Sequence, residues 1–240
     1  MSRGKSIQPS LKLHTPPKQP EIKHECILGV SGSGKSFFIK TKRIPKYFEN
    51  PNILKVLIDP EDEYSYLKIP TILLKDGEEF QKNIVALLKK FRAVRIVPPI
   101  PKNKREFDKN LEKFNNLYLF ILNNWGAIYK FCKAKGLVII IDECQDCGAD
   151  SRYLSYPLIS LLKKGRKRNI KCILATQRVS YFSPDIRSQC RIKVLFKVVE
   201  PLDIKRYREI SEEATELLLN SKKPYPYVIL EDGKIIEKDV

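Results

Sequence analysis

Long apolar runs are absent from this 240-residue sequence. No stretch approaches the roughly 18 to 20 consecutive apolar residues that a membrane-spanning helix needs. Residues 1–20 also lack the apolar centre of a signal peptide. We therefore expect neither a signal peptide nor a transmembrane segment, and we expect a soluble, intracellular protein.

Histidine is scarce, and the only two, His14 and His24, lie far from the C-x-x-C pair formed by Cys144 and Cys147. No second pair follows at a spacing typical of zinc sites. We expect the six cysteines to be reduced and mostly buried as small apolar residues. A metal or redox role for Cys144 and Cys147 is the alternative.

Acidic residues are outnumbered, 28 against 45 basic ones, which gives a formal net charge of +17. Such an excess suits a polyanionic partner, of which nucleic acid is the commonest. A generally lysine-rich surface that keeps the protein soluble is the other explanation. Local clustering of the basic residues favours nucleic acid.

The first 20 residues contain no acid, four prolines and several basic residues. This composition predicts a flexible basic arm. The remaining residues, 21–240, are enough for one substantial domain and too few for two of ordinary size. We therefore expect a single folded domain after the arm.

Apolar runs alternate with helical periodicity from residue 21 onward, which predicts an α/β fold with a mostly parallel sheet flanked by helices. A D-G turn at Asp232-Gly233 between two apolar runs predicts a C-terminal β-hairpin. Strands are predicted at about 25–30, 53–59, 71–75, 93–98, 136–142, 170–176 and 191–198. Helices are predicted near 36–43, 77–91, 106–134, 155–165 and 201–219.

A phosphate loop is the clearest motif, because residues 29–36 fit G-x-x-x-x-G-K-[ST] at every fixed position. An apolar run precedes it and a helical segment follows, as the chemistry of a nucleoside triphosphate site requires. Lys35 would reach the β- and γ-phosphates, and the Ser36 hydroxyl would be a Mg²⁺ ligand. The loop consists of Gly29, Val30, Ser31, Gly32, Ser33, Gly34, Lys35 and Ser36.

A second motif follows the apolar strand 137–141, where Asp142 and Glu143 come at the carboxyl end. Ligands bind at this end of strands in open α/β sheets. Asp142 would hold the Mg²⁺ shell, and Glu143 would orient and deprotonate the water that attacks the γ-phosphate. The pair favours hydrolysis over transfer to a substrate hydroxyl.

A third apolar strand, 170–176, ends in Gln177. If this strand lies beside the phosphate-loop strand, Gln177 can contact the γ-phosphate or the attacking water. A basic cluster at 163–171, which includes Arg166 and Arg168, comes just before it. The cluster is open to three interpretations: a DNA-phosphate patch, an arginine finger for a neighbouring subunit's nucleotide, or a solvated helix end.

Taken together, the segments GVSGSGKS, LVIIIDE, GRKRNI and ILATQR resemble the HerA/FtsK superfamily of DNA-pumping P-loop ATPases. The segments Val56–Tyr64 and Phe182–Ile186 add to the resemblance, which covers about residues 25–200. The short chain is most similar to the compact, A32-like genome-packaging ATPases of viruses with internal membranes, including archaeal viruses. ATPases of the zonula-occludens-toxin type share the same core.

The resemblance implies a RecA-like ASCE P-loop NTPase fold, in which an extra strand separates the phosphate-loop strand from the Asp-Glu strand. It implies ATP and Mg²⁺ at the site, with Lys35, Glu143 and Gln177 in catalysis. It also implies a trans-acting arginine that matches Arg166, with Arg168 close by. Family members form rings, generally hexamers, around double-stranded DNA.

These features predict an ATPase that translocates double-stranded DNA, packaging a viral genome in the host cytoplasm or in association with the virion. Its further partners would be capsid, portal-vertex or membrane proteins. A segregation, conjugation or repair motor would use the same chemistry. An assembly or secretion ATPase that acts on protein at a membrane, or a nucleotide-gated structural protein without turnover, are the alternatives from other classes.

Overall fold

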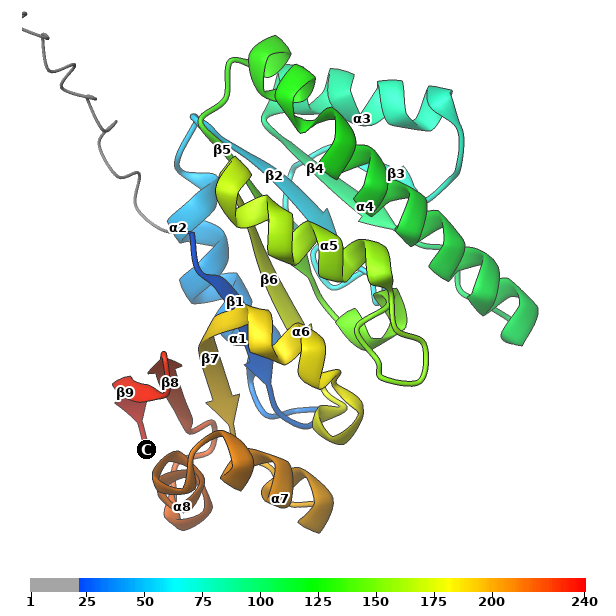
Figure 1. The fold of residues 1–240 in the computed structure, drawn as a ribbon. Helices are drawn as coiled ribbons and strands as arrows, with labels where there is room; N and C mark the ends of the chain where they lie inside the picture. The colour runs from blue at the N-terminus through cyan, green and yellow to red at the C-terminus, as the bar shows by residue number, and fades with distance from the viewer. Residues whose placement is uncertain (1–21) are drawn as a thin grey trace, which may run out of the picture.

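The computed structural model describes residues 22–240, so the predicted arm at 1–20 lies outside the described residues. The chain forms one nine-stranded sheet in the order β3-β4-β2-β5-β6-β1-β7-β8-β9, with helices on both faces (Figure 1). Strands β1 to β7 pair in parallel, whereas β8 and β9 pair antiparallel and form the predicted C-terminal hairpin. The α/β fold with a mostly parallel sheet is therefore confirmed.

Every predicted strand is present within a few residues of its expected bounds, because buried β-branched runs bounded by turn residues form parallel strands. The strands are β1 (His24–Leu28), β2 (Ile53–Ile58), β3 (Thr71–Leu73), β4 (Ala93–Val97), β5 (Gly136–Ile141), β6 (Ile170–Thr176), β7 (Cys190–Phe196), β8 (Tyr227–Glu231) and β9 (Lys234–Asp239).

The centre of the sheet has the strand order that the resemblance implies. Strand β6 lies between β5 and β1 and pairs in parallel with both. Thr176, the last residue of β6, is in register with Leu28, the last residue of β1. The phosphate-loop strand and the Asp-Glu strand are thus separated by one extra strand, as in ASCE P-loop NTPases.

The helices α3, α4 and α5 agree with the predictions, whereas the short segments α2, α6, η2, η3 and η4 lie outside the helices predicted from sequence. The helical segments are α1 (Lys35–Phe38), the π-helical turn η1 (Ile39–Arg43), α2 (Ile44–Phe48), α3 (Glu78–Phe91), α4 (Lys104–Cys132), α5 (Tyr156–Gly165), α6 (Pro184–Gln189), α7 (Pro201–Ile210) and α8 (Glu212–Asn220), with 3₁₀ turns η2 (Cys144–Cys147), η3 (Arg166–Arg168) and η4 (Val179–Tyr181).

One helix prediction was wrong in detail, because the segment 201–219 is two helices that meet at Ser211. Ser211 has extended backbone angles, and its hydroxyl accepts a hydrogen bond of 3.2 Å from the Ala214 N–H. A serine in this conformation caps the start of a new helix, and the acids that follow suit the helix N-terminus. The apolar periodicity continues across Ser211, so the periodicity alone could not reveal the helix break.

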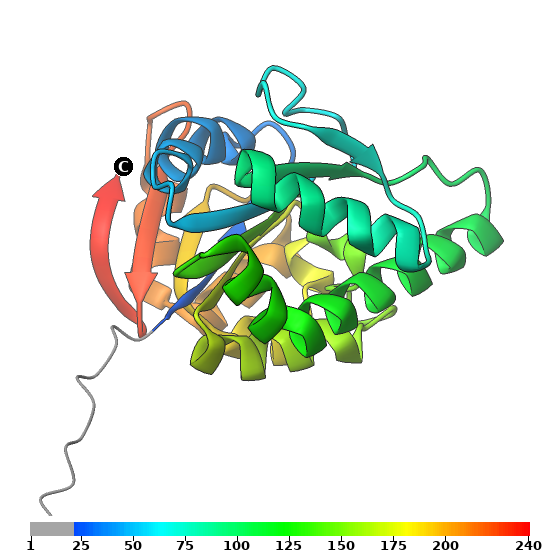
Figure 2. The ribbon, with the colours of Figure 1, turned by 90° about the horizontal axis from the view of Figure 1, so that it is seen from above.

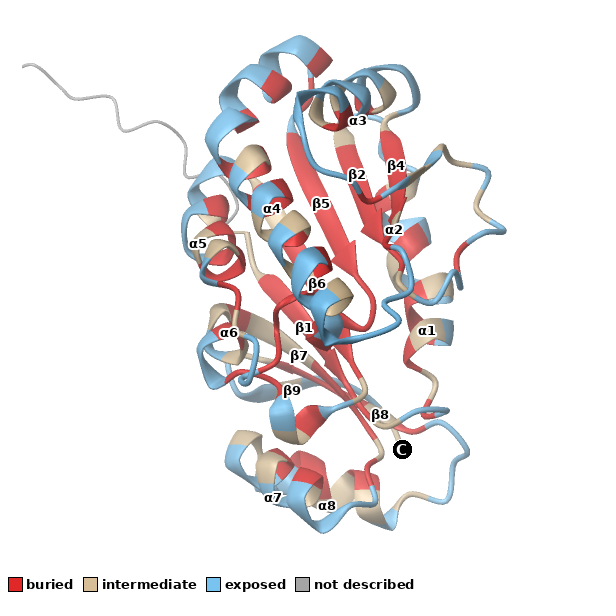
Figure 3. Cartoon of the chain, turned by 90° about the vertical axis from the view of Figure 1, so that its right-hand side faces the viewer, coloured by how far each residue is buried: buried red, intermediate tan, exposed pale blue. Residues whose placement is uncertain are grey.

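Alternate residues of the central strands face two separate cores. In β5, Ile139 and Ile141 pack under α4 and α5, whereas Val138 and Ile140 pack under α1 and α2. Figure 2 shows these helix groups on opposite sides of the sheet, and Figure 3 shows the buried strands between them. None of the described helices is long and apolar enough to cross a membrane.

His24 fastens the start of β1 to its neighbours. The Cys172 N–H donates a hydrogen bond of 2.9 Å to Nδ1, so Nε2 carries the proton and donates to the Leu162 carbonyl at 2.7 Å. Burial, with further effects from the charges of Arg166 and Lys171, lowers the His24 pKa to about 4, although the Leu162 contact opposes the shift. The folded protein therefore keeps His24 neutral.

Stability should depend on pH through His24. The unfolded chain takes up the proton near pH 6.5 and the folded chain only near 4, so the stabilising contribution is complete above pH 6.5 and is lost as the pH falls towards 4. We expect the free energy of unfolding by urea to fall by about 1.3 kcal/mol from pH 7.5 to 5.5 through this group. His24→Gln should show a correspondingly smaller fall; an equal fall in both proteins would contradict this role.

Candidate functional site

The phosphate loop, residues 29–36, connects the carboxyl end of β1 to α1. Gly32 and Gly34 have positive φ angles, 72° and 100°, which residues with a Cβ atom rarely adopt. The Lys35 side chain is buried and donates a hydrogen bond of 2.8 Å to the Val30 carbonyl. The loop therefore curls around its own lysine and leads into the N-terminus of α1, an arrangement typical of phosphate binding.

Close packing explains the first glycine of the loop. A Cβ atom at Gly29 would lie 2.7 Å from Cβ of Phe196 on β7 and 2.7 Å from Oγ of Ser33. Ser33 Oγ is itself buried, and it has no hydrogen-bond partner within residues 22–240. An unpaired buried hydroxyl is costly. Inside a phosphate loop it leaves a donor available to an anion.

Asp142 and Glu143 follow β5 at the same edge of the sheet. The Asp142 carboxylate accepts hydrogen bonds from the Tyr64 hydroxyl at 2.7 Å and from the Glu143 N–H at 3.0 Å. Glu143 has a left-handed backbone, with φ 44°, which is uncommon for a residue other than glycine. The chain thereby turns sharply at Glu143, and both carboxyl groups stay near the phosphate loop.

The charges of the site act on one another. Burial lowers the pKa of Lys35, while the nearby carboxylates of Glu143, Asp142 and Glu63 oppose that shift. Burial raises the pKa of both Asp142 and Glu143. The three carboxylates outnumber the two nearby ammonium groups, Lys35 and Lys40, the second of which pairs with Glu63 at 3.5 Å. The excess of negative charge favours a cation at the place where phosphates would bind.

The oxygen donors here fit Mg²⁺. Ser36 follows Lys35 in α1, and its hydroxyl and the Asp142 carboxylate are hard ligands of the type Mg²⁺ prefers. No group of three or more His, Cys, Asp or Glu side chains in the described part of the chain could hold a metal ion. Mg²⁺ at phosphate sites does not require one, because it binds through one or two protein ligands and the substrate phosphates.

A buried amide, which we did not predict, links Glu143 to β6. Gln145 Nε2 donates to Glu143 Oε2 at 2.5 Å, and the Thr176 hydroxyl donates to Gln145 Oε1 at 2.7 Å. Thr176 Oγ1 in turn accepts from the Arg178 N–H at 3.1 Å. Gln145 and Thr176 are both buried. A glutamine two residues after the Asp-Glu pair is the sequence signal that could have indicated this link.

Gln177 lies in sequence between Thr176 and Arg178, which are joined by the hydrogen bond from the Arg178 N–H. It is half-buried and follows Thr176 at the carboxyl end of β6. The Thr176 carbonyl also accepts a hydrogen bond of 3.4 Å from the Gly29 N–H, so the end of β6 is joined directly to the phosphate loop. The structure therefore brings the phosphate loop, the Asp142–Glu143 pair and Gln177 to one edge of the sheet.

Tyr64 is a second residue missed from sequence, although it lies in the segment 56–64 that we quoted. Both carboxylate oxygens of Asp59 accept hydrogen bonds of 3.0 Å, from the N–H groups of Glu63 and Tyr64. Arg95 of β4 forms an ion pair with Asp59 at 2.9 Å. This buried arrangement shapes the loop after β2 so that Tyr64 reaches Asp142.

Arg166 and Arg168 lie at the other edge of the sheet. They form the 3₁₀ turn before β6, whose seven residues separate them from Gln177 by about 20 Å. Arg168 donates to the Leu122 carbonyl of α4, while Arg166 makes a long contact of 3.5 Å with Gln189. Neither arginine is brought to the phosphate loop of its own chain.

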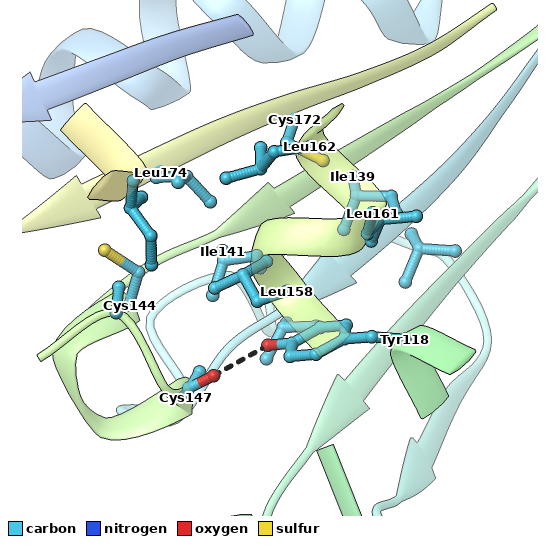
Figure 4. Close-up of a cluster of buried hydrophobic side chains, with 14 of the residues drawn as sticks. Tyr118, Ile139, Ile141, Cys144, Cys147, Leu158, Leu161, Leu162, Cys172 and Leu174 are labelled. Carbon is cyan, nitrogen blue, oxygen red and sulfur yellow. Dashed lines mark hydrogen bonds between the residues drawn. The ribbon is translucent and has the colours of Figure 1, made fainter. Parts of the chain in front are cut away.

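The C-x-x-C pair is part of the core. Cys144 and Cys147 are buried among Ile139, Ile141 and Leu158 (Figure 4). The Tyr118 hydroxyl donates a hydrogen bond of 2.9 Å to the Cys147 carbonyl. Burial raises the pKa of both thiols well above its usual range. These contacts favour the packing interpretation of the pair over metal or redox chemistry.

Two of three comparisons relate the chain to known proteins. The zonular occludens toxin (Zot) family matches residues 84–236. Among solved structures, the genome packaging NTPase B204 from Sulfolobus turreted icosahedral virus 2, in complex with ATP-gammaS, matches with a TM-score of 0.64 at 22% identity, over 91% of this chain and 98% of that chain. A comparison with curated proteins finds no match.

Two further structures are similar. B204, the DNA-packaging ATPase from Sulfolobus turreted icosahedral virus, has a TM-score of 0.60 at 26% identity, over 90% of this chain and 97% of that chain. VirB4 of Thermoanaerobacter pseudethanolicus has a TM-score of 0.62 at 14% identity, over 90% and 89% of the two chains. The P-loop NTPase fold expected from the sequence is confirmed by these likenesses.

The Tyr64–Asp142 contact predicts a stability difference. Tyr64→Phe removes the hydroxyl and leaves a buried carboxylate oxygen without its donor, which costs about 1–3 kcal/mol. Tyr66→Phe is the matched control, because Tyr66 is 54% exposed and should tolerate the change within about 0.5 kcal/mol. Urea unfolding at pH 7 measures both, and equal stability of the two variants would contradict the role of the contact.

Proposed function

The chain belongs to the zonular occludens toxin (Zot) family, and from this premise and the geometry of the site we propose that it is an ATP-hydrolysing motor that translocates double-stranded DNA. The observation that carries the proposal is the meeting of the phosphate loop, Asp142–Glu143 and Gln177 at one sheet edge, through the strand order β5-β6-β1. The B204 structures, described as genome-packaging NTPases, support packaging of a viral genome as the role.

ATP binds with its β- and γ-phosphates in the loop 29–36. Lys35 exchanges its contact with the Val30 carbonyl for the phosphate oxygens, and the exposed backbone of Gly32 and the hydroxyl of Ser33 add donors. Ser36 and Asp142 would hold Mg²⁺, and the ion would supply positive charge to the phosphates. Tyr64 keeps the Asp142 carboxylate in one orientation.

Glu143 is the base that deprotonates the attacking water. Its side chain is anchored by Gln145, and the hydrogen bond from the Thr176 hydroxyl to Gln145 Oε1 orients the amide so that Nε2 faces Glu143. Gln177, next to Thr176, contacts the γ-phosphate or the water. Loss of the γ-phosphate is thereby transmitted from Gln177 through Thr176 and Gln145 to the base, and to the loop 177–183.

A second subunit supplies the arginine. Arg166 is the better candidate, because Arg168 is already bound to the Leu122 carbonyl of α4. A guanidinium from the far edge of a neighbouring sheet would stabilise charge on the γ-phosphate, which requires a ring of subunits, and we propose a hexamer. The remaining basic residues, within a net charge of +17, would contact DNA phosphates without reading base sequence.

An assembly or secretion ATPase that acts on protein at a membrane is the second candidate. The Zot family assignment and the likeness to VirB4 favour it. In that case the positive charge would serve anionic lipid. Segregation, conjugation and repair motors remain within the first proposal, since their chemistry is the same. We place the working protein in the host cytoplasm or at the virion, with capsid, portal-vertex or membrane proteins as partners.

We expect duplex DNA at low salt to stimulate ATP hydrolysis several-fold, with the stimulation lost as salt rises, because phosphate contacts release counterions. Phosphate release is the measurement, with anionic vesicles as the comparison. Turnover that is indifferent to DNA but rises with vesicles would favour the membrane candidate and contradict the DNA motor.

Glu143→Gln should retain ATP binding and lose hydrolysis by about 100-fold or more, because the amide cannot accept the proton. Glu61→Gln is the control, since this exposed carboxylate lies outside the Glu143 network. A Glu143→Gln protein that hydrolyses ATP at the wild-type rate would instead indicate a protein without base-catalysed turnover.

A further inference from the structure

A cavity of about 440 Å³ extends from the phosphate loop towards the C-terminal part of the chain. Gly32, Gly34, Lys35 and Ser36 form one end, and Phe37, Glu63 and Tyr225 line the rest. Glu63 belongs with the charged groups, because it forms an ion pair with Lys40 at 3.5 Å and acts on Lys35. The apolar surface of the cavity comes from two aromatic side chains, Phe37 and Tyr225.

These two aromatics are exposed where their neighbours are packed. Phe37 is 69% exposed and Tyr225 is 58% exposed. Phe38, the next residue of α1, is buried and packs edge-on against Tyr227 of β8 at 5.2 Å between ring centroids. The chain therefore turns one aromatic of each pair into the core and presents the other to the cavity. Large exposed rings beside a nucleotide site indicate a ligand surface.

The backbone holds Tyr225 in place beside the loop. Prolines on both sides, Pro224 and Pro226, restrict its backbone conformation, and Pro226 is buried. A Cβ atom at Gly34 would lie 3.3 Å from Cβ of Tyr225, so the tyrosine packs directly on the glycine that precedes Lys35. The backbone and Cβ of Tyr225 are thus held beside the loop, which lowers the entropic cost of binding.

We infer that Tyr225 and Phe37 form the binding surface for the purine base of the nucleotide. With the β- and γ-phosphates fixed by the loop, the α-phosphate, ribose and base must extend out of it along the cavity, and its aromatic part is where a flat, apolar ring gains contact. Stacking of bases on aromatic side chains is a common source of nucleotide affinity. This inference rests on the proposed function.

Binding of ATP and of inorganic tripolyphosphate, each with Mg²⁺, tests it. Tripolyphosphate keeps the phosphate contacts and has no base. Tyr225→Ala should weaken ATP binding about tenfold, or 1.4 kcal/mol, and change tripolyphosphate binding by less than about twofold. Tyr225→Phe should bind ATP as the wild type does, because the ring is retained. Tyr156→Ala, which removes an exposed ring of α5 outside the cavity, is the control.

Phe37→Ala provides a second variant on the other element and should show the same selective loss. Two results would overturn the proposed base-binding surface while leaving the nucleotide site intact. One is an equal loss of affinity for ATP and tripolyphosphate, and the other is an unchanged affinity for ATP in both variants. If the wild-type protein bound neither ATP nor tripolyphosphate, the proposed function would be overturned together with the inference. Urea unfolding of each variant shows that a loss of binding does not come from loss of the fold.

Discussion

The parallel pairing of β5, β6 and β1 is the constraint on which the rest of the site depends. Parallel strands end at the same edge, so residues far apart in sequence, Lys35, Asp142, Glu143 and Gln177, come together once these three strands are adjacent. The same pairing carries Arg166 to the opposite edge, because it precedes β6 rather than following it. The strand order therefore places the nucleotide-binding residues at the carboxyl ends of the strands and the proposed trans-acting arginine at the amino ends.

Buried polar contacts convert that common edge into a fixed geometry. Asp59 shapes the loop that brings Tyr64 to Asp142, and Thr176 orients the Gln145 amide that holds Glu143. Each buried group here has a partner, and removal of one would leave the other unsatisfied in a low-dielectric interior. Glu143 has a left-handed backbone that costs about 1 kcal/mol or more. The core packing around β5 and β6 supplies the stability that maintains it.

Much of this could be predicted from sequence. Continuous apolar runs such as 137–141 are typical of strands buried on both faces, and the phosphate loop and the Asp-Glu pair have fixed local spacing. The break at Ser211 was missed because apolar periodicity continues across it. Tyr64, Gln145 and Tyr225 were missed because their roles depend on contacts across the sheet edge, which no local pattern encodes. The role of Arg166 stays a prediction, since one chain cannot contain both halves of the site.

The most direct test of this division is to mix two inactive proteins, Arg166→Ala and Glu143→Gln, and to measure DNA-stimulated ATP hydrolysis across their ratios. In a mixed ring, some interfaces pair a subunit that retains Glu143 with a neighbour that retains Arg166, so activity should reappear and peak at intermediate ratios. Arg168→Ala in place of Arg166→Ala should remain active by itself, because Arg168 is bound within its own chain. Absence of recovery at every ratio would contradict a site completed by a second subunit.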